Sequence, residues 1–519
     1  MEHGVLINAT LFEIDGRLPV VNFFFWGGQH RFAMPPISLL AGRLAKESCA
    51  SAQAYRTVKD VSPRNSKTMI EDILCRYKDS TLIAIHKPTG KWCSLEIDSE
   101  HSAKLCPGQH FQKFPFSADS DVFNAVVDAL DLNQGEQFSD GRSFEYLLLK
   151  CTSACNYHCT YCYDHDEVEK SKNLDLHATC SAVKQAIDLS RTHLTLLFHG
   201  GEPLIRFRFV HDVSIFASSY AASAGKKIFF KLQTHGGMFD DAIVDFLTRY
   251  DFFVGISLDG PREVNDKFRV LKNGQGTYAK FEAAYHRYPE FMRERCGIIT
   301  TPTTVSAQHL LRVARHFRDM GFRAWRTTNY LAIGRVQDDW SYETDSDTYV
   351  NAVLGLVDAI EAGEFDGFYI GPVMSLLTNL LSDERPDMCT PGNNSCGAGR
   401  RFLSIEADGT ILPCDTLNRN DFSVGHISLD SLKDALRHPN AEQISASLPR
   451  RGCHFCALLG ICGGTCLGLS SLSRVRPMLC EAYQRLYPEL MDRLLRSSKL
   501  ADYFDECCAI EDAKLEAVV

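Results

Sequence analysis

From about residue 145 onward, short apolar runs alternate with longer amphipathic segments. The apolar runs cover residues 144–150, 194–199, 227–234, 252–258, 296–301 and 324–329. The segments between them, such as 240–250 and 306–321, carry apolar residues at helical spacing, and the second ends at a glycine cap, Gly321. Strands that alternate with helices form a parallel sheet. The pattern predicts an α/β fold, in the form of a partial (β/α)6 barrel rather than a complete eightfold one.

Other regions flank this core. Residues 1–140 predict a separate α+β domain, in which 5–14 and 18–26 are strands, 67–78 is a helix, and 80–97 is a hairpin that turns at residues 88–90. We assign the barrel to residues 141–345. Beyond it we expect a helical linker at 346–388, a cysteine-rich domain at 389–485, and a tail at 486–519 that contains an amphipathic helix.

Composition limits the class of protein. The chain has 519 residues, and its hydrophobic fraction of 45% is typical of globular proteins. It contains no run of about eighteen apolar residues, and its first residues lack the basic end and apolar stretch of a signal peptide. We therefore expect a cytoplasmic protein with no membrane partner. The formal net charge of -10 argues against nucleic acid as a partner.

The chain has 20 cysteines. Persistent disulfides are rare in a reducing cytosol, so regularly spaced thiols indicate metal ligands or catalytic groups. The spaced sets are Cys155, Cys159 and Cys162; Cys389, Cys396 and Cys414; Cys453, Cys456, Cys462 and Cys466; and Cys480. We expect most of the remaining cysteines to be small buried hydrophobic residues.

The first set follows the first predicted strand, at the end of the barrel where active sites lie. Three thiolates on a [4Fe-4S] cluster leave one iron without a protein ligand, and a small molecule can bind there. A structural zinc ion is the alternative, with a fourth ligand from Cys151 or His158. The spacing of this set leaves both alternatives open.

The spacing CxxxCxxC, with Tyr161 before the last cysteine, resembles the radical S-adenosylmethionine (radical SAM) family. The segments "HGGEP", "QTHG" and "SLDGP" follow the next three predicted strands and resemble the segments with which that family binds its cofactor. In this family the cofactor yields a 5′-deoxyadenosyl radical. His235 stands where the family usually has Asn. The resemblance implies that S-adenosylmethionine is bound by Tyr161, Gly200, Gly201, Glu202, Gln233, Thr234, Ser257 and Asp259.

The later cysteines resemble the SPASM extension of peptide-modifying radical SAM enzymes, which holds two auxiliary [4Fe-4S] clusters. The segment "CHFCALLGICGGTC" has the spacing CxxCx5CxxxC and lies between Cys414 and Cys480. The resemblance implies a nearer cluster on Cys389, Cys396, Cys414 and Cys466, and a farther cluster on Cys453, Cys456, Cys462 and Cys480. Two zinc ribbons are the alternative, since they need the same number of cysteines.

Asp415 directly follows Cys414. In sulfatase-maturating members of the family, an aspartate at this place acts as the base that removes a substrate proton, so the resemblance implies that Asp415 is catalytic. The alternative is a structural carboxylate that hydrogen-bonds the loop around Cys414.

The resemblance also implies a peptide substrate and an external electron donor such as flavodoxin or ferredoxin. We expect a maturase that oxidises a ribosomally made peptide and forms a side-chain crosslink, either a carbon-carbon cyclophane or a thioether, with the auxiliary clusters accepting the second electron. A sulfatase-type maturase that makes formylglycine and a non-enzymatic iron-sulfur electron carrier are the alternatives. For residues 1–140, leader-peptide recognition and a structural cap both stay open.

Overall fold

The computed structural model describes residues 8–12, 20–24, 70, 72–87, 90–97, 105, 111–117, 120–130, 144–164, 171–382, 396–417, 419–446, 453, 456–464, 466 and 478–516. The chain divides into two compact units. Unit 1 comprises Met1–Gln137, Leu380–Glu384 and Phe455–Ile461, and unit 2 comprises Phe138–Asn379, Arg385–His454 and Cys462–Val519. Within the described ranges, no helix has both the length and the apolar character needed to cross a membrane.

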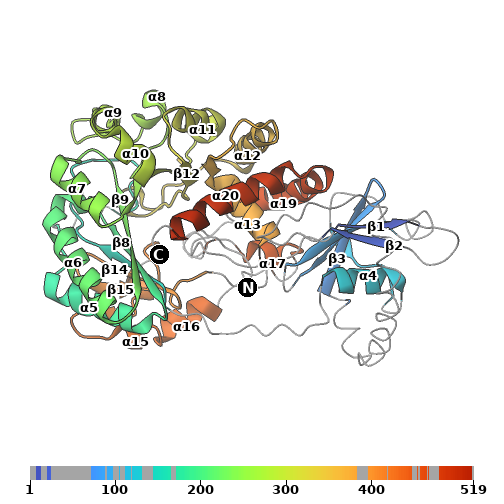
Figure 1. Cartoon of the computed structure of the whole chain (residues 1–519), viewed down its shortest axis with the longest axis horizontal. Coiled ribbons are helices and arrows are strands. Elements are labelled where there is room, and N and C mark those ends of the chain that lie inside the picture. Colours follow the sequence, from blue (N-terminus) through green and yellow to red (C-terminus); the bar gives the residue numbers. More distant parts are fainter. Residues whose placement is uncertain are drawn as a thin grey trace. The chain divides into compact units, whose positions relative to one another are not determined.

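Unit 1 contains a sheet whose strands lie in the order β2-β1-β5-β4-β3-β6 (Figure 1). These strands are β1 (Asn8–Phe12), β2 (Val20–Phe24), β3 (Ile73–Lys78), β4 (Thr81–His86), β5 (Trp92–Glu96) and β6 (Gln112–Lys113). Helix α4 (Asp121–Ala129) shares one hydrophobic core with β3, β4 and β5. It begins at Ser120, whose Oγ accepts a hydrogen bond from the Phe123 N–H at 3.1 Å, as is usual at a helix N-terminus.

The predictions for this unit are confirmed in part. β1 and β2 confirm the strands expected at 5–14 and 18–26. β4 and β5 confirm the hairpin, although Pro88 and Thr89 of its turn lie outside the described residues. The helix expected at 67–78 is wrong, because residues 73–78 form β3, which pairs with β4 so that Cys75 faces Ala84. Burial of Ile73 and Cys75 against α4 outweighs the local helical pattern.

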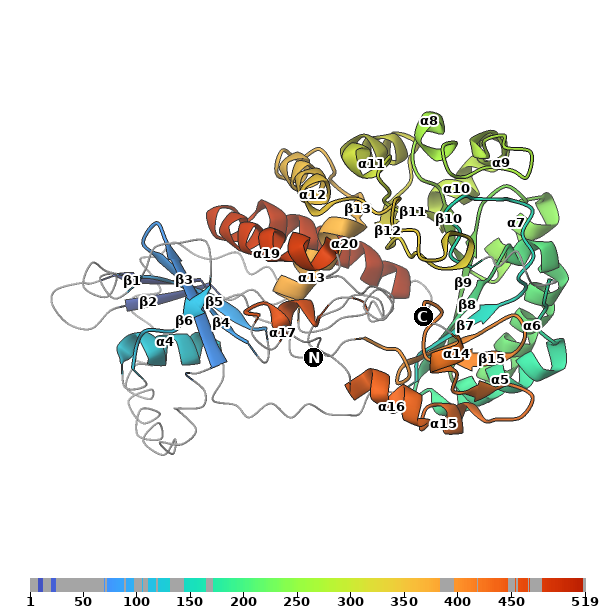
Figure 2. The same ribbon diagram turned by 180° about the vertical axis from the view of Figure 1, so that it is seen from behind.

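Unit 2 is built on a parallel sheet, shown from two sides in Figures 1 and 2. Its strands lie side by side in chain order: β7 (Tyr146–Lys150), β8 (His193–His199), β9 (Lys227–Thr234), β10 (Phe253–Ser257), β11 (Cys296–Thr300), β12 (Ala324–Thr327) and the short β13 (Tyr369–Ile370). The first six confirm the predicted barrel strands. Most of these strands are rich in apolar residues, as is usual for a parallel sheet that helices cover, although β9 exposes Lys227 and Lys231.

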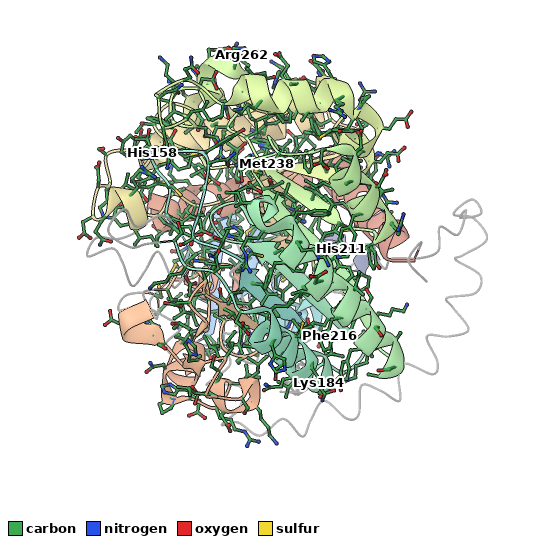
Figure 3. All side chains as sticks on the ribbon, turned by 90° about the vertical axis from the view of Figure 1, so that its left-hand side faces the viewer. His158, Lys184, His211, Phe216, Met238 and Arg262 are labelled. Carbon is green, nitrogen blue, oxygen red and sulfur yellow. The ribbon has the colours of Figure 1, made fainter. Side chains whose placement is uncertain are left out.

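Helices connect these strands. They are α5 (Leu176–Leu189), η3 (Pro203–Arg206), α6 (Phe207–Ser223), α7 (Asp241–Arg249), α8 (Arg262–Asn265), α9 (Tyr278–Arg287), α10 (Pro289–Arg295), η4 (Ala307–His309), α11 (Leu310–Asp319), η5 (Gly334–Val336) and α12 (Ser346–Glu361). Figure 3 looks onto this outer layer, with Lys184 on α5 and His211 and Phe216 on α6. The predicted cap after α11 is confirmed, since Gly321 has a φ of +85°, which glycine adopts readily.

The cysteine-rich region continues the same sheet. β14 (Phe402–Ile405) pairs in parallel with β7, and β15 (Thr410–Leu412) and β16 (Gly425–His426) follow antiparallel, so the sheet has 10 strands. The remaining helices are α13 (Gly371–Leu381), α14 (Arg419–Phe422), α15 (Leu432–Ala435), α16 (Pro439–Ala446), α17 (Leu459–Cys462), α19 (Met478–Arg496) and α20 (Lys499–Glu516). The tail helix expected from the sequence is therefore two helices, α19 and α20.

The buried hydroxyl of Thr300 links three neighbouring strands, β10, β11 and β12, near their carboxyl ends. Thr300 Oγ1 donates a hydrogen bond to the Leu258 carbonyl at 2.7 Å and accepts one from Trp325 Nε1 at 2.9 Å. Thr300 and Trp325 are fully buried. Loss of the hydroxyl would leave a carbonyl and an indole N–H unpaired in the core, which is costly.

We therefore expect Thr300→Val to lower the free energy of unfolding by about 2 to 4 kcal/mol. Thr300→Ser keeps the hydroxyl and loses one methyl group, so it should cost only about 1 kcal/mol. Urea denaturation of both variants measures the difference. Equal losses in the two variants would show that the hydrogen bonds contribute nothing.

Candidate active site

The first cysteine set lies on the loop that follows β7, at the carboxyl end of the parallel strands. We call residues 151–164 of this loop the cysteine loop. Burial raises the pKa of the Cys155 and Cys162 thiols to about 12, so both hold their protons until a metal displaces them. Among the described residues, no three His, Cys, Asp or Glu side chains converge closely enough to hold one metal ion. Three thiols on one loop are a donor set that fits an iron-sulfur cluster.

The two residues considered as a fourth zinc ligand make other contacts. Cys151 is fully buried, and its Sγ donates to the Leu149 carbonyl at 3.6 Å. The imidazole of His158 contacts the guanidinium of Arg335. Neither contact directs a fourth ligand to the three thiols. The arrangement therefore fits a cluster that leaves one iron open.

Gly200 and Gly201 pack against the backbone just before Cys155. A Cβ atom on Gly200 would lie 2.5 Å from the Thr152 carbonyl oxygen, and one on Gly201 would lie 2.3 Å from the Ala154 carbonyl oxygen. The Gly201 N–H also donates to the Thr152 carbonyl at 2.8 Å. These glycines therefore let the end of β8 touch the cysteine loop, a packing role that the resemblance does not indicate.

Glu202 is fully buried and joins the ends of β8 and β9. Its carboxylate accepts hydrogen bonds from Thr234 Oγ1 at 2.8 Å, from the Leu204 N–H at 3.0 Å and from the His235 N–H at 3.0 Å. The side chains of Glu202 and Thr234, both predicted cofactor contacts, are thus used within the protein. They hold the loops that surround the cluster site.

His235 fastens the cysteine loop to β9. Its ring stacks on Tyr157, with centroids 3.6 Å apart, and its Nε2 lies 2.7 Å from Asn156 Oδ1. The Gly237 N–H donates to His235 Nδ1 at 3.0 Å, so this network assigns the ring proton to Nε2. Burial lowers the pKa of His235, which agrees with a neutral ring. The residue that departs from the family pattern thus positions the segment next to Cys155.

A second network fastens the loop to β10 and β11. Tyr161 Oη donates to Asp259 Oδ2 at 2.5 Å and accepts from Arg269 Nη1 at 3.0 Å. Asp259 Oδ1 accepts the Thr301 N–H at 3.3 Å. Tyr161, Asp259 and Arg269 are all buried. The predicted cofactor contacts Tyr161 and Asp259 thus bind each other.

Two of the predicted contacts have side chains free for a ligand. Gln233 lies near the end of β9 and Ser257 ends β10, and both are half-buried. Within the part of the chain that the structure describes, neither side chain has a hydrogen-bond partner. Half-buried polar groups that lack protein partners fit a polar ligand such as S-adenosylmethionine.

Lys150 lies at the centre of a buried charge cluster that the sequence did not single out. Its Nζ lies 2.6 Å from Asp164 Oδ1, 3.1 Å from Glu406 Oε1 and 3.5 Å from the Asp415 carbonyl oxygen. All three charged side chains are less than 10% exposed. Burial opposes the lysine charge, but Asp164, Glu406 and Asp415 outweigh it, so the pKa of Lys150 is raised. The ammonium therefore joins the cysteine loop to the strand β14.

Asp415, the predicted catalytic residue, faces this cluster. Tyr163 Oη donates to Asp415 Oδ2 at 2.9 Å and lies 3.5 Å from His199 Nε2. Burial raises the pKa of Tyr163 well above its usual value, so the phenol keeps its proton and donates. His199 Nδ1 is buried and has no hydrogen-bond partner in the described part of the chain. The Asp415 carboxylate thus lies near the cysteine loop and contacts Tyr163, which in turn contacts His199.

The structure describes all but one of the cysteines predicted to hold the auxiliary clusters. Cys389 lies outside the described residues. Cys396 and Cys414 pack against one small core of Ala398, Leu417 and Ile444, so the structure brings these two thiols to the same place. Cys453, Cys456, Cys462, Cys466 and Cys480 are described and form no disulfide. Their assignment to a nearer and a farther cluster stays a prediction.

Sequence reasoning gave no role to Lys150, Tyr163, Asp164, His199 or Glu406. Signals for some of them are present in the sequence. Lys150 is a charged residue that ends an apolar strand, and His199 directly precedes the paired glycines. The partner Glu406 carries no such signal, because it meets Lys150 only through the pairing of β14 with β7.

Comparisons with known proteins agree with this geometry. The model of the Radical SAM superfamily matches residues 149–344, and the SPASM model, an iron-sulfur cluster-binding domain, matches residues 396–458. A cysteine-type anaerobic sulfatase-maturating enzyme of Clostridium novyi (strain NT) is 26% identical over 295 residues, which cover 55% of this chain and 77% of the relative.

Two solved structures share the fold. Native anSMEcpe with bound AdoMet and the Kp18Cys peptide has a TM-score of 0.58 at 23% identity, covering 68% of this chain and 98% of its own. Streptococcus suis SuiB bound to the precursor peptide SuiA has a TM-score of 0.50 at 16% identity, covering 79% and 98%. Both agree with an α/β barrel followed by a cysteine-rich domain.

Removal of one thiol tests the cluster assignment. Cys155→Ala should lose about one third of the iron bound after anaerobic reconstitution, because one of three clusters loses a ligand, and it should no longer cleave S-adenosylmethionine. Cys151→Ala is the matched control and should keep both properties, since this thiol is used within the protein. Iron analysis and 5′-deoxyadenosine formation with dithionite measure the outcome. The opposite result would make Cys151 the ligand.

Removal of the buried ammonium tests the charge cluster. Lys150→Met leaves two buried carboxylates without their partner, so the free energy of unfolding should fall by about 3 to 5 kcal/mol. The double variant Lys150→Met/Asp164→Asn should recover part of this loss. Lys172→Met is the control, because its 3.3 Å ion pair with Asp408 is partly exposed and should contribute less than about 1 kcal/mol. Similar losses for Lys150→Met and Lys172→Met would contradict the assignment.

Proposed function

This chain is a radical SAM enzyme with a C-terminal SPASM domain, and from that premise we propose that it oxidises a side chain of a ribosomally made peptide and joins it to a second atom. The product is a carbon-carbon cyclophane or a thioether crosslink. The carboxylate of Asp415 beside the cysteine loop supports the oxidation step. The sheet of unit 1, which lies outside the family models, is the observation that favours a crosslink over formylglycine.

The cofactors, S-adenosylmethionine and [4Fe-4S] clusters, supply a carbon radical that removes a hydrogen atom from an unactivated C–H bond and an acceptor for the remaining electron. Crosslinking removes two hydrogens from the substrate in total, one as an atom and one as a proton with an electron. In our proposal Asp415 accepts that proton. Tyr163 holds the Asp415 carboxylate through the 2.9 Å hydrogen bond, and Lys150 holds the Asp415 backbone through the carbonyl.

The N-terminal part of the chain supports a peptide substrate with a leader segment. The family models begin at residue 149, so the sheet of unit 1 lies outside them. Among the described strands, β2 is at one end of this sheet and pairs on one side only, with β1. An extended peptide could add to the edge that β2 presents among these strands. Residues 73–78, expected to be helical, form the strand β3, so this part of the proposal rests on the sheet edge.

Formylglycine formation is the second candidate, because the relative from Clostridium novyi is a cysteine-type sulfatase-maturating enzyme. Oxidation of a cysteine side chain at Cβ would remove the same two hydrogens and give a thioaldehyde, which water would convert to the aldehyde with release of sulfide. The same base, Asp415, serves both products. An external flavodoxin or ferredoxin would supply the reducing electron in either case.

Asp415→Asn tests the proton acceptor. This variant should still form 5′-deoxyadenosine with dithionite, while product formation falls by about 10²-fold or more, since only the proton acceptor is lost. Tyr163→Phe keeps the carboxylate and should have a smaller effect. Both variants should bind as much iron as the wild type. Product formation at the wild-type rate in Asp415→Asn would exclude this residue as the base.

The two products are distinguished with peptides made from short reading frames beside the gene and with a cysteine-containing sulfatase peptide. A crosslinked product loses two hydrogens and does not react with a hydrazine probe, whereas formylglycine forms a hydrazone. Mass spectrometry after digestion reads both outcomes. A hydrazone from the sulfatase peptide alone would replace our first candidate with the second.

A further inference from the structure

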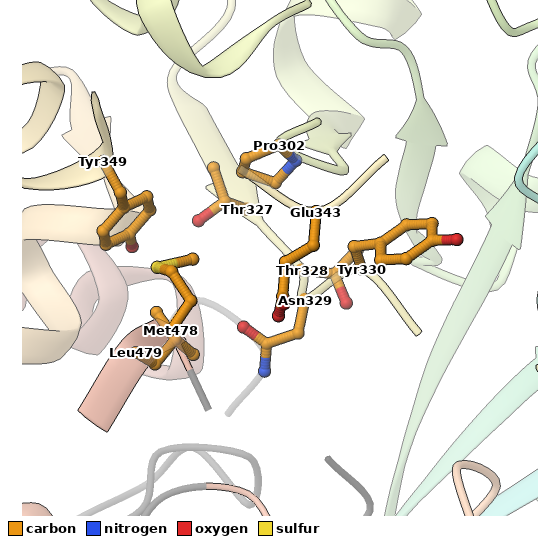
Figure 4. Close-up of a pocket in the computed structure, with 9 residues that line it drawn as sticks. All are labelled: Pro302, Thr327, Thr328, Asn329, Tyr330, Glu343, Tyr349, Met478 and Leu479. Carbon is orange, nitrogen blue, oxygen red and sulfur yellow. The ribbon is translucent and has the colours of Figure 1, made fainter. Parts of the chain in front are cut away.

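A pocket opens beside the carboxyl ends of β11 and β12 in unit 2 (Figure 4). Its lining residues come from the loops after these strands, from the segment before α12 and from the starts of α12 and α19. They are Pro302, Thr327, Thr328, Asn329, Tyr330, Glu343, Tyr349, Met478 and Leu479. The pocket lies on the strand edge that carries the cysteine loop.

Glu343 provides the only charge in this lining. Its side chain is half-buried, and in the part of the chain that the structure describes it has no hydrogen bond or ion pair. Burial raises the pKa of the Glu343 carboxyl. A carboxylate in such a place has a favourable position for an external cation.

The neighbouring acidic residues differ from Glu343 in this respect. Asp339 accepts a hydrogen bond from the Ser341 N–H at 2.9 Å, and Asp345 caps α12 by accepting the Thr348 N–H at 2.7 Å. Asp347 forms an ion pair with Arg485. Each of these acids has a structural use. Asp339 and Asp345, which have no ion pair among the described residues, add negative potential near the pocket.

The remaining lining suits a long side chain with a polar head. Tyr349, Met478 and Leu479 supply apolar surface on one side, and Thr328 and Asn329 supply polar groups near Glu343 (Figure 4). A lysine or arginine has an aliphatic stem that packs on apolar surface and a cationic head that binds a carboxylate. No other common side chain combines these two properties.

We propose that this pocket binds a basic side chain, lysine or arginine, of the peptide substrate. The site fixes which part of the peptide lies at the edge of the barrel, and so it selects the residue that reaches the radical. This inference rests on the proposed function only in taking the substrate to be a peptide.

Short neutral-ended peptides test the pocket without requiring turnover. The probes are acetyl-Ala-Lys-Ala-amide, acetyl-Ala-Arg-Ala-amide and the uncharged acetyl-Ala-norleucine-Ala-amide, titrated into the unreduced holoenzyme by calorimetry. At least one basic probe should bind about tenfold more tightly than the norleucine probe, which corresponds to about 1.4 kcal/mol. The tighter of the two basic probes identifies the preferred residue.

Glu343→Gln keeps the shape of the side chain and should abolish this preference, whereas Asp339→Asn, on the same acidic segment but outside the lining, should retain it. Unchanged iron content and melting temperature in Glu343→Gln show that the fold is intact. Equal binding of all three probes to the wild type, or an undiminished preference in Glu343→Gln, would overturn the inference. A preserved preference without oxidised peptide product would instead count against the proposed function alone.

Discussion

The arrangement of the candidate site depends on the ion pairs of Lys150, the last residue of β7. Its ammonium contacts the carboxylate of Asp164 on the cysteine loop and that of Glu406 directly after β14. Burial of either carboxylate without a cation beside it would cost several kcal/mol of desolvation. The pairing therefore ties the loop that carries Cys162 to the strand that leads toward Cys414. Two parts of the chain that hold different cysteine sets are thereby fixed to the same strand.

The cysteine loop has little regular structure of its own, so its shape comes from neighbouring strand ends. The glycines after β8 allow backbone contact, His235 after β9 stacks on the loop, and Asp259 after β10 binds Tyr161. The same motifs resemble cofactor-binding segments, and those contacts stay a prediction. In the structure most of their buried side chains position the loop, while Gln233 and Ser257 keep their polar groups available. A site that cleaves a cofactor homolytically needs such rigid positioning more than it needs acid or base groups.

The sequence predicted the barrel well because parallel strands are buried on both faces and therefore stand out as apolar runs. It failed at 67–78, where a helical pattern was overruled by pairing with β4 and burial of Cys75. It also could not predict that β14 would join the barrel sheet, since that depends on a pairing between residues more than 250 positions apart. For the same reason the sequence could not predict the charge cluster around Lys150, because Glu406 meets Lys150 only through this strand pairing.

Lys150 and Glu343 show two outcomes for a buried charge at the same strand edge. Around Lys150 every charge has a partner inside the protein, as expected for groups that hold a structure together. Glu343 bears the cost of partial burial with no described partner, and the fold could have avoided that cost with a glutamine or a threonine. A carboxylate in a pocket that has no partner among the described residues favours a partner that arrives from outside. The same reasoning separates the groups that build this site from those that meet its substrate.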